Sequence, residues 1–67
     1  MNTMALKEVS ERQPFRPFTV RLNNGAQYTF NAPRNFGAPE DYREIVFFGK
    51  SELVLIDPES ITEIIPQ

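Results

Sequence analysis

The chain contains no cysteine, no histidine and no tryptophan among its 67 residues. Without cysteine, disulfides and thiolate zinc sites are excluded, and without histidine the commonest metal ligand and general base is missing. The serines and threonines therefore have no imidazole to activate them as nucleophiles. Three isolated glycines form no phosphate-binding loop. The sequence thus predicts a protein that is not an enzyme, with no catalytic residues, no metal and no cofactor.

Long apolar segments are also lacking. A run such as Leu53 to Ile56 is far shorter than the roughly 20 residues of a membrane-spanning helix. The first eight residues carry no apolar core of a signal peptide, so we expect a cytoplasmic protein with no membrane partner. Residues 1–67 are expected to form one domain, and a domain this small buries only about 60% of its unfolded surface. With disulfides and metals excluded, self-association is the reinforcement that remains.

Charge is distributed unequally around a formal net charge of −2. Residues 1–34 carry five basic and two acidic side chains, whereas residues 35–67 carry two basic and seven acidic side chains. This asymmetry is compatible with an ordinary solvated surface. Alternatively, it describes a polarised surface that pairs copies head to tail, or a basic face that meets phosphate.

A short helix is predicted at about residues 3–13, followed by two strands at about 18–22 and 26–31. Thr3 is a candidate N-cap, and Pro14 cannot donate into a helical ladder. Apolar and polar residues alternate in both strands. A three-residue turn, Asn23 to Gly25, places all apolar side chains of the hairpin on one face, whereas a two-residue turn mixes them. The pattern therefore predicts a G1-bulge hairpin with Gly25 in the left-handed region.

Three more strands are expected at about residues 44–49, 52–57 and 61–65, after an irregular segment at 31–42. The first two of these strands are apolar at consecutive positions, which indicates that both of their faces are covered. In so short a chain the cover is a closed barrel, the helix or a subunit interface. The predicted fold class is mainly β, with a short N-terminal helix followed by a small, bent five-stranded barrel.

The irregular segment holds the residues best suited to binding. Aromatic rings for stacking, an amide for base edges and cations for phosphate are the groups used by single-stranded nucleic-acid sites. The candidate nucleic-acid site comprises Arg34, Asn35, Phe36, Tyr42 and Arg43. In the alternative interpretation, the two rings pack beneath their own loop and the arginines pair with Glu40 and Asp41. The acidic pairs Glu40–Asp41 and Asp57/Glu59 lie in turns, where solvated carboxylates are expected.

Two blocks of sequence resemble the Sm-like family. The first is Phe18-x-Val20-x-Leu22-x-Asn24-Gly25 after a helix, and the second is the closing Ser60-Ile61-Thr62-Glu63-Ile64-Ile65-Pro66. The resemblance implies a helix-capped, five-stranded bent barrel that assembles into rings through its fourth and fifth strands and binds RNA. It therefore implies a homo-oligomer whose interface includes Leu53, Leu55, Ile61, Ile64 and Ile65.

Departures from the family pattern bear on the activity. Pro58 and Glu59 stand where the RNA-binding members carry a Lys-His pair, and an acidic residue there repels phosphate. Pro33 ends the second strand early, where the family has a bending glycine. The Pro14-Phe15-Arg16-Pro17-Phe18 segment also resembles short uncharacterised bacterial proteins with the same P-F-x-P-F start. The rival prediction is therefore a protein-interaction or regulatory module with no nucleic-acid affinity.

Overall fold

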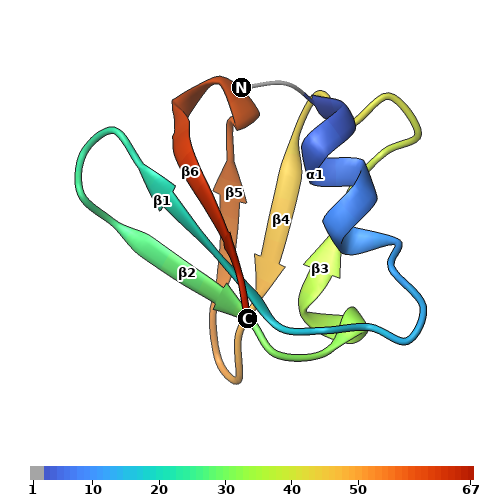
Figure 1. The fold of residues 1–67 in the computed structure, drawn as a ribbon. Helices are drawn as coiled ribbons and strands as arrows, with labels where there is room; N and C mark the ends of the chain where they lie inside the picture. Colours follow the sequence, from blue (N-terminus) through green and yellow to red (C-terminus); the bar gives the residue numbers. More distant parts are fainter. Residues whose placement is uncertain (1–2) are drawn as a thin grey trace.

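The computed structural model describes residues 3–67 and is mainly β, with one short helix at the N-terminal side (Figure 1). The helix α1 spans Thr3–Ser10. The strands are β1 (Phe18–Leu22), β2 (Gln27–Phe30), β3 (Phe36–Gly37), β4 (Ile45–Phe48), β5 (Leu53–Ile56) and β6 (Ile61–Pro66). Two short 3-10 helices, η1 (Pro33–Asn35) and η2 (Pro58–Ser60), precede β3 and β6. The predicted fold class is confirmed at this level.

The strands form two three-stranded sheets, ordered β2-β1-β6 and β3-β4-β5. Among the described residues no strand pair joins the sheets and no closed barrel forms, so the structure does not confirm the predicted bent five-stranded barrel. The interruption lies at residues 31–35, between β2 and β3. Pro33 has no N–H to give to a ladder, and it starts η1 instead of continuing the strand. The chain therefore crosses from one sheet to the other there.

The β1–β2 hairpin has the predicted register. Val20 lies opposite Tyr28, and Phe18 lies opposite Phe30. The Leu22 N–H donates to the Ala26 carbonyl at 2.8 Å, and Gly25 has a φ of +90°. Glycine adopts this left-handed conformation without the steric cost that a Cβ imposes. The parity of the apolar residues thus identified both the turn and the inward face.

The helix is shorter than predicted, because α1 ends at Ser10 and not near residue 13. Thr3, expected as an N-cap, is itself helical. The Glu11 N–H still donates to the Lys7 carbonyl at 3.0 Å, after which residues 11–17 form a connector to β1. Leu6 is fully buried, so the predicted apolar face of the helix does pack against the strands.

The core lies between the two sheets and beneath α1, which covers one side of the space between them (Figure 1). Its buried members are Leu6, Phe18, Val20, Phe30, Tyr42, Ile45, Ile56 and Ile61. The Phe18 and Phe30 rings, opposite each other on β1 and β2, stack with centroids 4.9 Å apart. Phe36 meets both rings edge-on from β3, so an aromatic cluster joins the two sheets.

Candidate functional site

The outer face of the β3-β4-β5 sheet is apolar, and no other element of residues 3–67 covers it. Along β4 and β5, Ile45 and Ile56 are buried, while the alternate side chains point away from the core. The exposed fractions of the outward residues are 41% for Phe48, 60% for Leu53 and 63% for Leu55. Phe48 lies directly opposite Leu53 in the β4–β5 ladder. These large side chains are the chain's principal unexplained surface feature.

Gly37 completes this outer face on β3. A Cβ at this position would lie 2.8 Å from Cε2 of the Phe48 ring and 3.7 Å from Cβ of Val46. The aromatic ring therefore lies directly over the glycine on the neighbouring strand. Hereafter the apolar face denotes Gly37, Val46, Phe48, Leu53 and Leu55.

The two ends of the apolar face differ in charge. At the β4–β5 turn, a shallow hollow of about 230 Å³ is lined by Arg34, Asn35, Phe48, Gly49 and Lys50. At the opposite end, a hollow of about 310 Å³ is lined by Arg43, Glu44, Leu55, Ile56 and Asp57. We call these the basic end and the acidic end. At the acidic end, the Arg43 guanidinium lies 3.6 Å from the Asp41 carboxylate, so its charge is already matched.

The five predicted nucleic-acid residues do not form one patch. Arg34 is exposed at the basic end, whereas Arg43 precedes β4 and is exposed at the acidic end. Both polar groups of the Asn35 side chain have partners within the chain: Oδ1 accepts from the Ala32 N–H at 3.0 Å, and Nδ2 donates to the Phe48 carbonyl at 2.8 Å. Asn35 thus anchors η1 to β4.

The two aromatic rings of the predicted site belong to the interior. Tyr42 is buried and Phe36 is half-buried, with their ring centroids 6.2 Å apart. The Tyr42 hydroxyl donates to Oε2 of Glu11 at 2.8 Å and lies 3.3 Å from the Ser10 hydroxyl. Burial raises the pKa of Tyr42; the Ser10 hydrogen bond opposes this effect, while Glu11 adds to it. The rings therefore pack beneath the loop, as the alternative interpretation predicted.

The predicted interface residues are divided between surface and core. Leu53 and Leu55 are exposed on the apolar face. Ile61 is buried within the chain at 4% exposure, and half-buried Ile64 packs against the same core. Ile65 is also half-buried and lies opposite Thr19 on the outward side of β6. Only the two leucines offer large apolar side chains to a partner as the structure stands.

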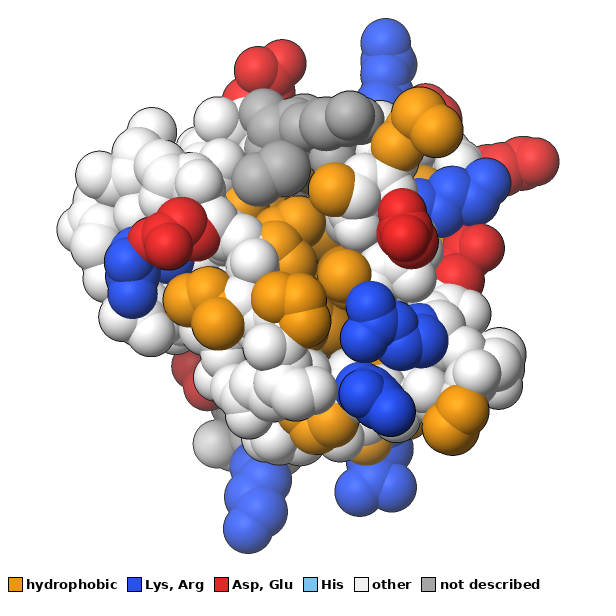
Figure 2. All heavy atoms as spheres, viewed as in Figure 1, with side chains coloured by type: hydrophobic (Ala, Val, Ile, Leu, Met, Phe, Trp, Pro, Cys, Tyr) orange, Lys and Arg blue, Asp and Glu red, His pale blue; other side chains and the backbone are white. Residues whose placement is uncertain are grey.

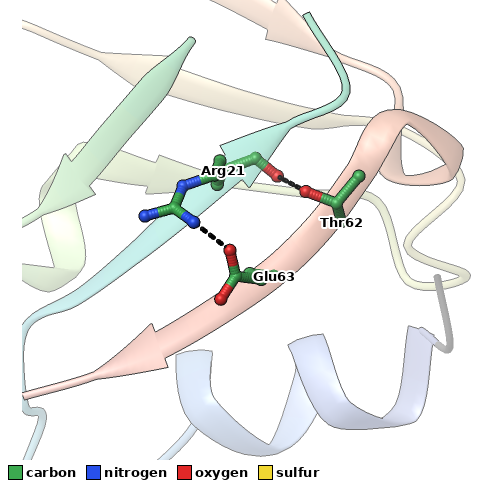
Figure 3. A network of polar contacts seen from close by, with 3 residues as sticks. All are labelled: Arg21, Thr62 and Glu63. Atoms are coloured by element: carbon green, nitrogen blue, oxygen red, sulfur yellow. Dashed lines mark hydrogen bonds and ion pairs between the residues drawn. The ribbon is translucent and has the colours of Figure 1, made fainter. Parts of the chain in front are cut away.

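Apart from half-buried Ile65, the outer face of the β2-β1-β6 sheet is polar, and several of its side chains are paired within the chain. The Thr19 and Thr29 hydroxyls lie 2.8 Å apart across β1 and β2. Arg21 forms an ion pair with Glu63 across β1 and β6 (Figure 3). Beside this pair, the Thr62 hydroxyl donates to the Arg21 carbonyl at 3.2 Å. This sheet has an outer surface suited to water.

Sequence reasoning missed the basic end because Phe48, Gly49 and Lys50 were assigned to a strand and its turn. The available signal was the pair Phe47-Phe48: in a strand, only one of two consecutive rings faces inward. Phe47 packs on the core and meets Phe30 at 5.4 Å, so Phe48 is the outward ring. Its exposure beside Lys50 was not detectable until the direction of each strand residue was known.

Figure 2 shows the side of the molecule that carries α1 and β6, where hydrophobic side chains reach the surface between these elements and basic side chains gather at the lower right. Within residues 3–67, no three or more acidic side chains cluster as a metal site would require. In the same residues, no helix is long and apolar enough to cross a membrane. Comparison with protein-family models, curated proteins and solved structures found no match.

Proposed function

We propose that the protein is a non-enzymatic, self-associating module of the Sm-like type. The proposal counts β2 and β3 as two halves of one strand interrupted at residues 31–35, which reduces six strands to the five that the resemblance implies. On this count β5 and β6 are the fourth and fifth strands, through which Sm-like proteins assemble. Each of them is the outermost strand of its sheet.

The open edges of β5 and β6 carry this proposal. The Gly49 N–H donates to the Glu52 carbonyl at 2.9 Å, and antiparallel pairs alternate between hydrogen-bonded and non-bonded. The backbone groups of Leu53 and Leu55 therefore point away from β4. On β6, the Gln67 N–H donates to the Pro17 carbonyl at 3.0 Å, so by the same alternation the groups of Ile64 point away from β1.

Unpaired edges of this kind pair readily with another strand. We propose that β5 of one copy aligns with β6 of the next. This head-to-tail contact leaves one unpaired β5 edge and one unpaired β6 edge at the ends of any open assembly. A closed ring pairs every β5 edge with a β6 edge. The contact is made by backbone groups, and it therefore tolerates changes of side chain better than loss of an N–H.

The test is molar mass in solution, measured by size-exclusion chromatography with light scattering at low and moderate salt. The wild-type chain is expected to form an assembly of several subunits. Leu53→Pro removes an outward N–H at the first position of an edge strand, where proline is tolerated. Its mass should fall, whereas Leu53→Val, which keeps the N–H, should assemble normally. A monomeric wild-type protein, or an unchanged mass for Leu53→Pro, overturns the proposal.

Nucleic-acid binding is a second candidate, and the basic end is the observation that favours it. Phe48 is exposed between Arg34 and Lys50, and within residues 3–67 neither cation forms an ion pair with an acid. An accessible ring flanked by cations suits a stacked base and its phosphates. Arg34 thus retains its predicted role, while Phe48 takes the stacking role that the sequence assigned to Phe36.

Fluorescence-anisotropy titration with labelled oligo-A and oligo-U tests this candidate. Phe48→Ala should weaken binding by about tenfold, because a stacked base contributes roughly 1–3 kcal/mol. Arg34→Ala should weaken binding and reduce its salt dependence, because it removes a contact with phosphate. Arg16→Ala is the matched control, since it removes an exposed arginine from the connector between α1 and β1. Equal losses in all three variants, or no binding, contradict a site at the basic end and favour the rival protein-interaction module.

A further inference from the structure

We propose that the apolar face is covered by the apolar face of a second copy. The two copies are related by a two-fold axis that lies between the two apolar faces and runs perpendicular to their strands. This contact uses the face of the β3-β4-β5 sheet and not its edges. It therefore stands independently of the head-to-tail contact proposed above.

Composition gives the first argument. An isolated sheet face exposed to water alternates with the buried face and is polar, as the outer face of the β2-β1-β6 sheet is. The apolar face instead presents a phenylalanine and two leucines, each more than two-fifths exposed. Two such faces can pack about 10 Å apart and interdigitate their side chains, as in a β-sandwich. A second copy supplies a surface of matching chemistry.

Charge selects the orientation. The basic end carries Arg34 and Lys50, with Glu52 beside Gly49 at the turn. The acidic end carries Glu44 and Asp57, while Arg43 there is paired with Asp41. A two-fold axis parallel to the strands would place each end over its own kind, and like charges would repel. An axis across the strands places the basic end of one copy over the acidic end of the other. The same complementary contact then occurs twice.

The central strand identifies the residues that meet. β4 lies between β3 and β5. An axis that crosses β4 at Phe47, midway between the outward residues Val46 and Phe48, lays β4 of one copy over β4 of the other in the opposite direction. Glu44 directly precedes this strand, and Lys50 lies two residues after its end. In the dimer, each Lys50 therefore faces the Glu44 of the other copy. Both side chains are exposed and free to adjust.

The strength of the contact follows from its size. Two strands of four residues and one of two, about 4.8 Å apart, span roughly 160 Å². A stable interface buries about 800 Å² per partner, so even with its charged ends this contact is small. We therefore expect a concentration-dependent dimer that dissociates on dilution and weakens with added salt.

Exchange of the two charges tests the proposal. Dimerisation is measured by sedimentation velocity at protein concentrations from about 10 µM to about 1 mM, a range that spans the dissociation constant of a weak dimer. Lys50→Glu and Glu44→Lys should each weaken dimerisation about tenfold, because each creates two like-charge contacts. The double variant should return to within about threefold of the wild type. Lys7→Glu makes the same charge change on α1 and should have no effect. Circular dichroism confirms that each variant is folded.

Val46→Asp provides a second test, since it places a charge at the centre of the apolar face and should abolish the dimer. Restoration by the charge exchange together with loss in Val46→Asp supports the proposal. Absence of self-association through this face up to 1 mM overturns it and leaves a different protein as the cover. Loss in Val46→Asp without charge restoration overturns the orientation. Leu53→Pro and its control Leu53→Val both change the leucine side chain on the apolar face, but only proline removes an edge N–H. The difference between these two variants therefore reports on the edges, and failure of either contact is distinguishable.

Discussion

The two sheets have similar inner faces and opposite outer faces. Outside β2-β1-β6, polar side chains bond to one another: Thr19 to Thr29 and Gln67, and Arg21 to Glu63. Outside β3-β4-β5, Phe48, Leu53 and Leu55 are exposed. In the first sheet, these outward polar groups have hydrogen-bond or ion-pair partners within the same chain. The second sheet presents large apolar side chains that no layer of residues 3–67 covers.

This difference separates apolar side chains that are buried within one chain from apolar side chains that stay exposed. Burial of the inner faces contributes to the stability of one chain, whereas burial of the apolar face would contribute only in the proposed dimer. Substitutions on the inner and outer sides of the same strand should therefore have separable effects.

The largest effect is expected on the inner side of β4. Ile45 is fully buried, so Ile45→Ala should lower the free energy of unfolding by about 2–5 kcal/mol through lost burial and a residual cavity. Phe48→Ala removes a larger side chain from the same strand and should change the monomer by less than about 1 kcal/mol. Urea unfolding at low micromolar concentration measures both. A comparable loss in Phe48→Ala would contradict an uncovered outer face in the monomer.

A smaller effect is expected at Tyr42, which seals the core from the loop before β4. Tyr42→Phe should lower the free energy of unfolding by about 1 kcal/mol at pH 7, since it removes the hydrogen bond to Glu11. The raised pKa in the folded state means that the unfolded chain loses its phenolic proton first. Stability from Tyr42 is thus fully present below about pH 10 and declines as the pH rises further.

Urea midpoints of the wild type and Tyr42→Phe, measured between pH 8 and 10.5, test the sign of this effect. The difference between the two proteins should be constant below about pH 9.5 and should shrink above pH 10. A difference that grows with pH would mean that the folded state favours the phenolate, contrary to the burial of this ring.

The sequence predicted the β1–β2 hairpin well and the candidate site poorly, for a common reason. In the hairpin, apolar and polar residues alternate, so only one register places all the apolar side chains, with Val20 opposite Tyr28, on one face. In β4 and β5 both faces are apolar, and no alternation shows which residues point outward. Only the structure shows which side chains of these strands point outward, and it leaves Phe48 and Leu55 exposed.

The irregular segment was harder still. Aromatic residues such as Phe36 and Tyr42 are typical both of a stacking site and of a small core. A loop has no sequence periodicity that would separate these two possibilities. Tyr42 also adopts a φ of +55°, a left-handed conformation that glycine or asparagine would signal but tyrosine does not. The sheet order depends on the break at residues 31–35, where Pro33 indicated an interruption without showing where the chain goes next.

Exchanging the polarity of one residue on each outer face sharpens the comparison. Thr19 is 6% exposed and bonds to Thr29 and Gln67, so Thr19→Val should cost up to about 1 kcal/mol of unfolding free energy. Val46→Thr introduces a hydroxyl on the apolar face, where water can solvate it in the monomer, and should be nearly neutral. Thermal melts of dilute samples measure both changes. A larger loss in Val46→Thr than in Thr19→Val would contradict both the paired polar groups outside β2-β1-β6 and the exposure of the apolar face in the monomer.

A small effect that depends on salt is expected at the Arg21–Glu63 ion pair on the outer side of β1 and β6 (Figure 3). The two side chains are 41% and 51% exposed, and such exposed pairs contribute only about 0.2–1 kcal/mol. A double-mutant cycle with Arg21→Ala and Glu63→Ala, measured by urea unfolding, should give a coupling free energy in this range that falls between 0.05 and 0.5 M salt. Lys7→Ala with Glu63→Ala is the control cycle and should give no coupling, because no ion pair joins these side chains. A coupling above about 2 kcal/mol that is insensitive to salt would mean that this face is desolvated, and therefore covered by a partner as is proposed for the apolar face.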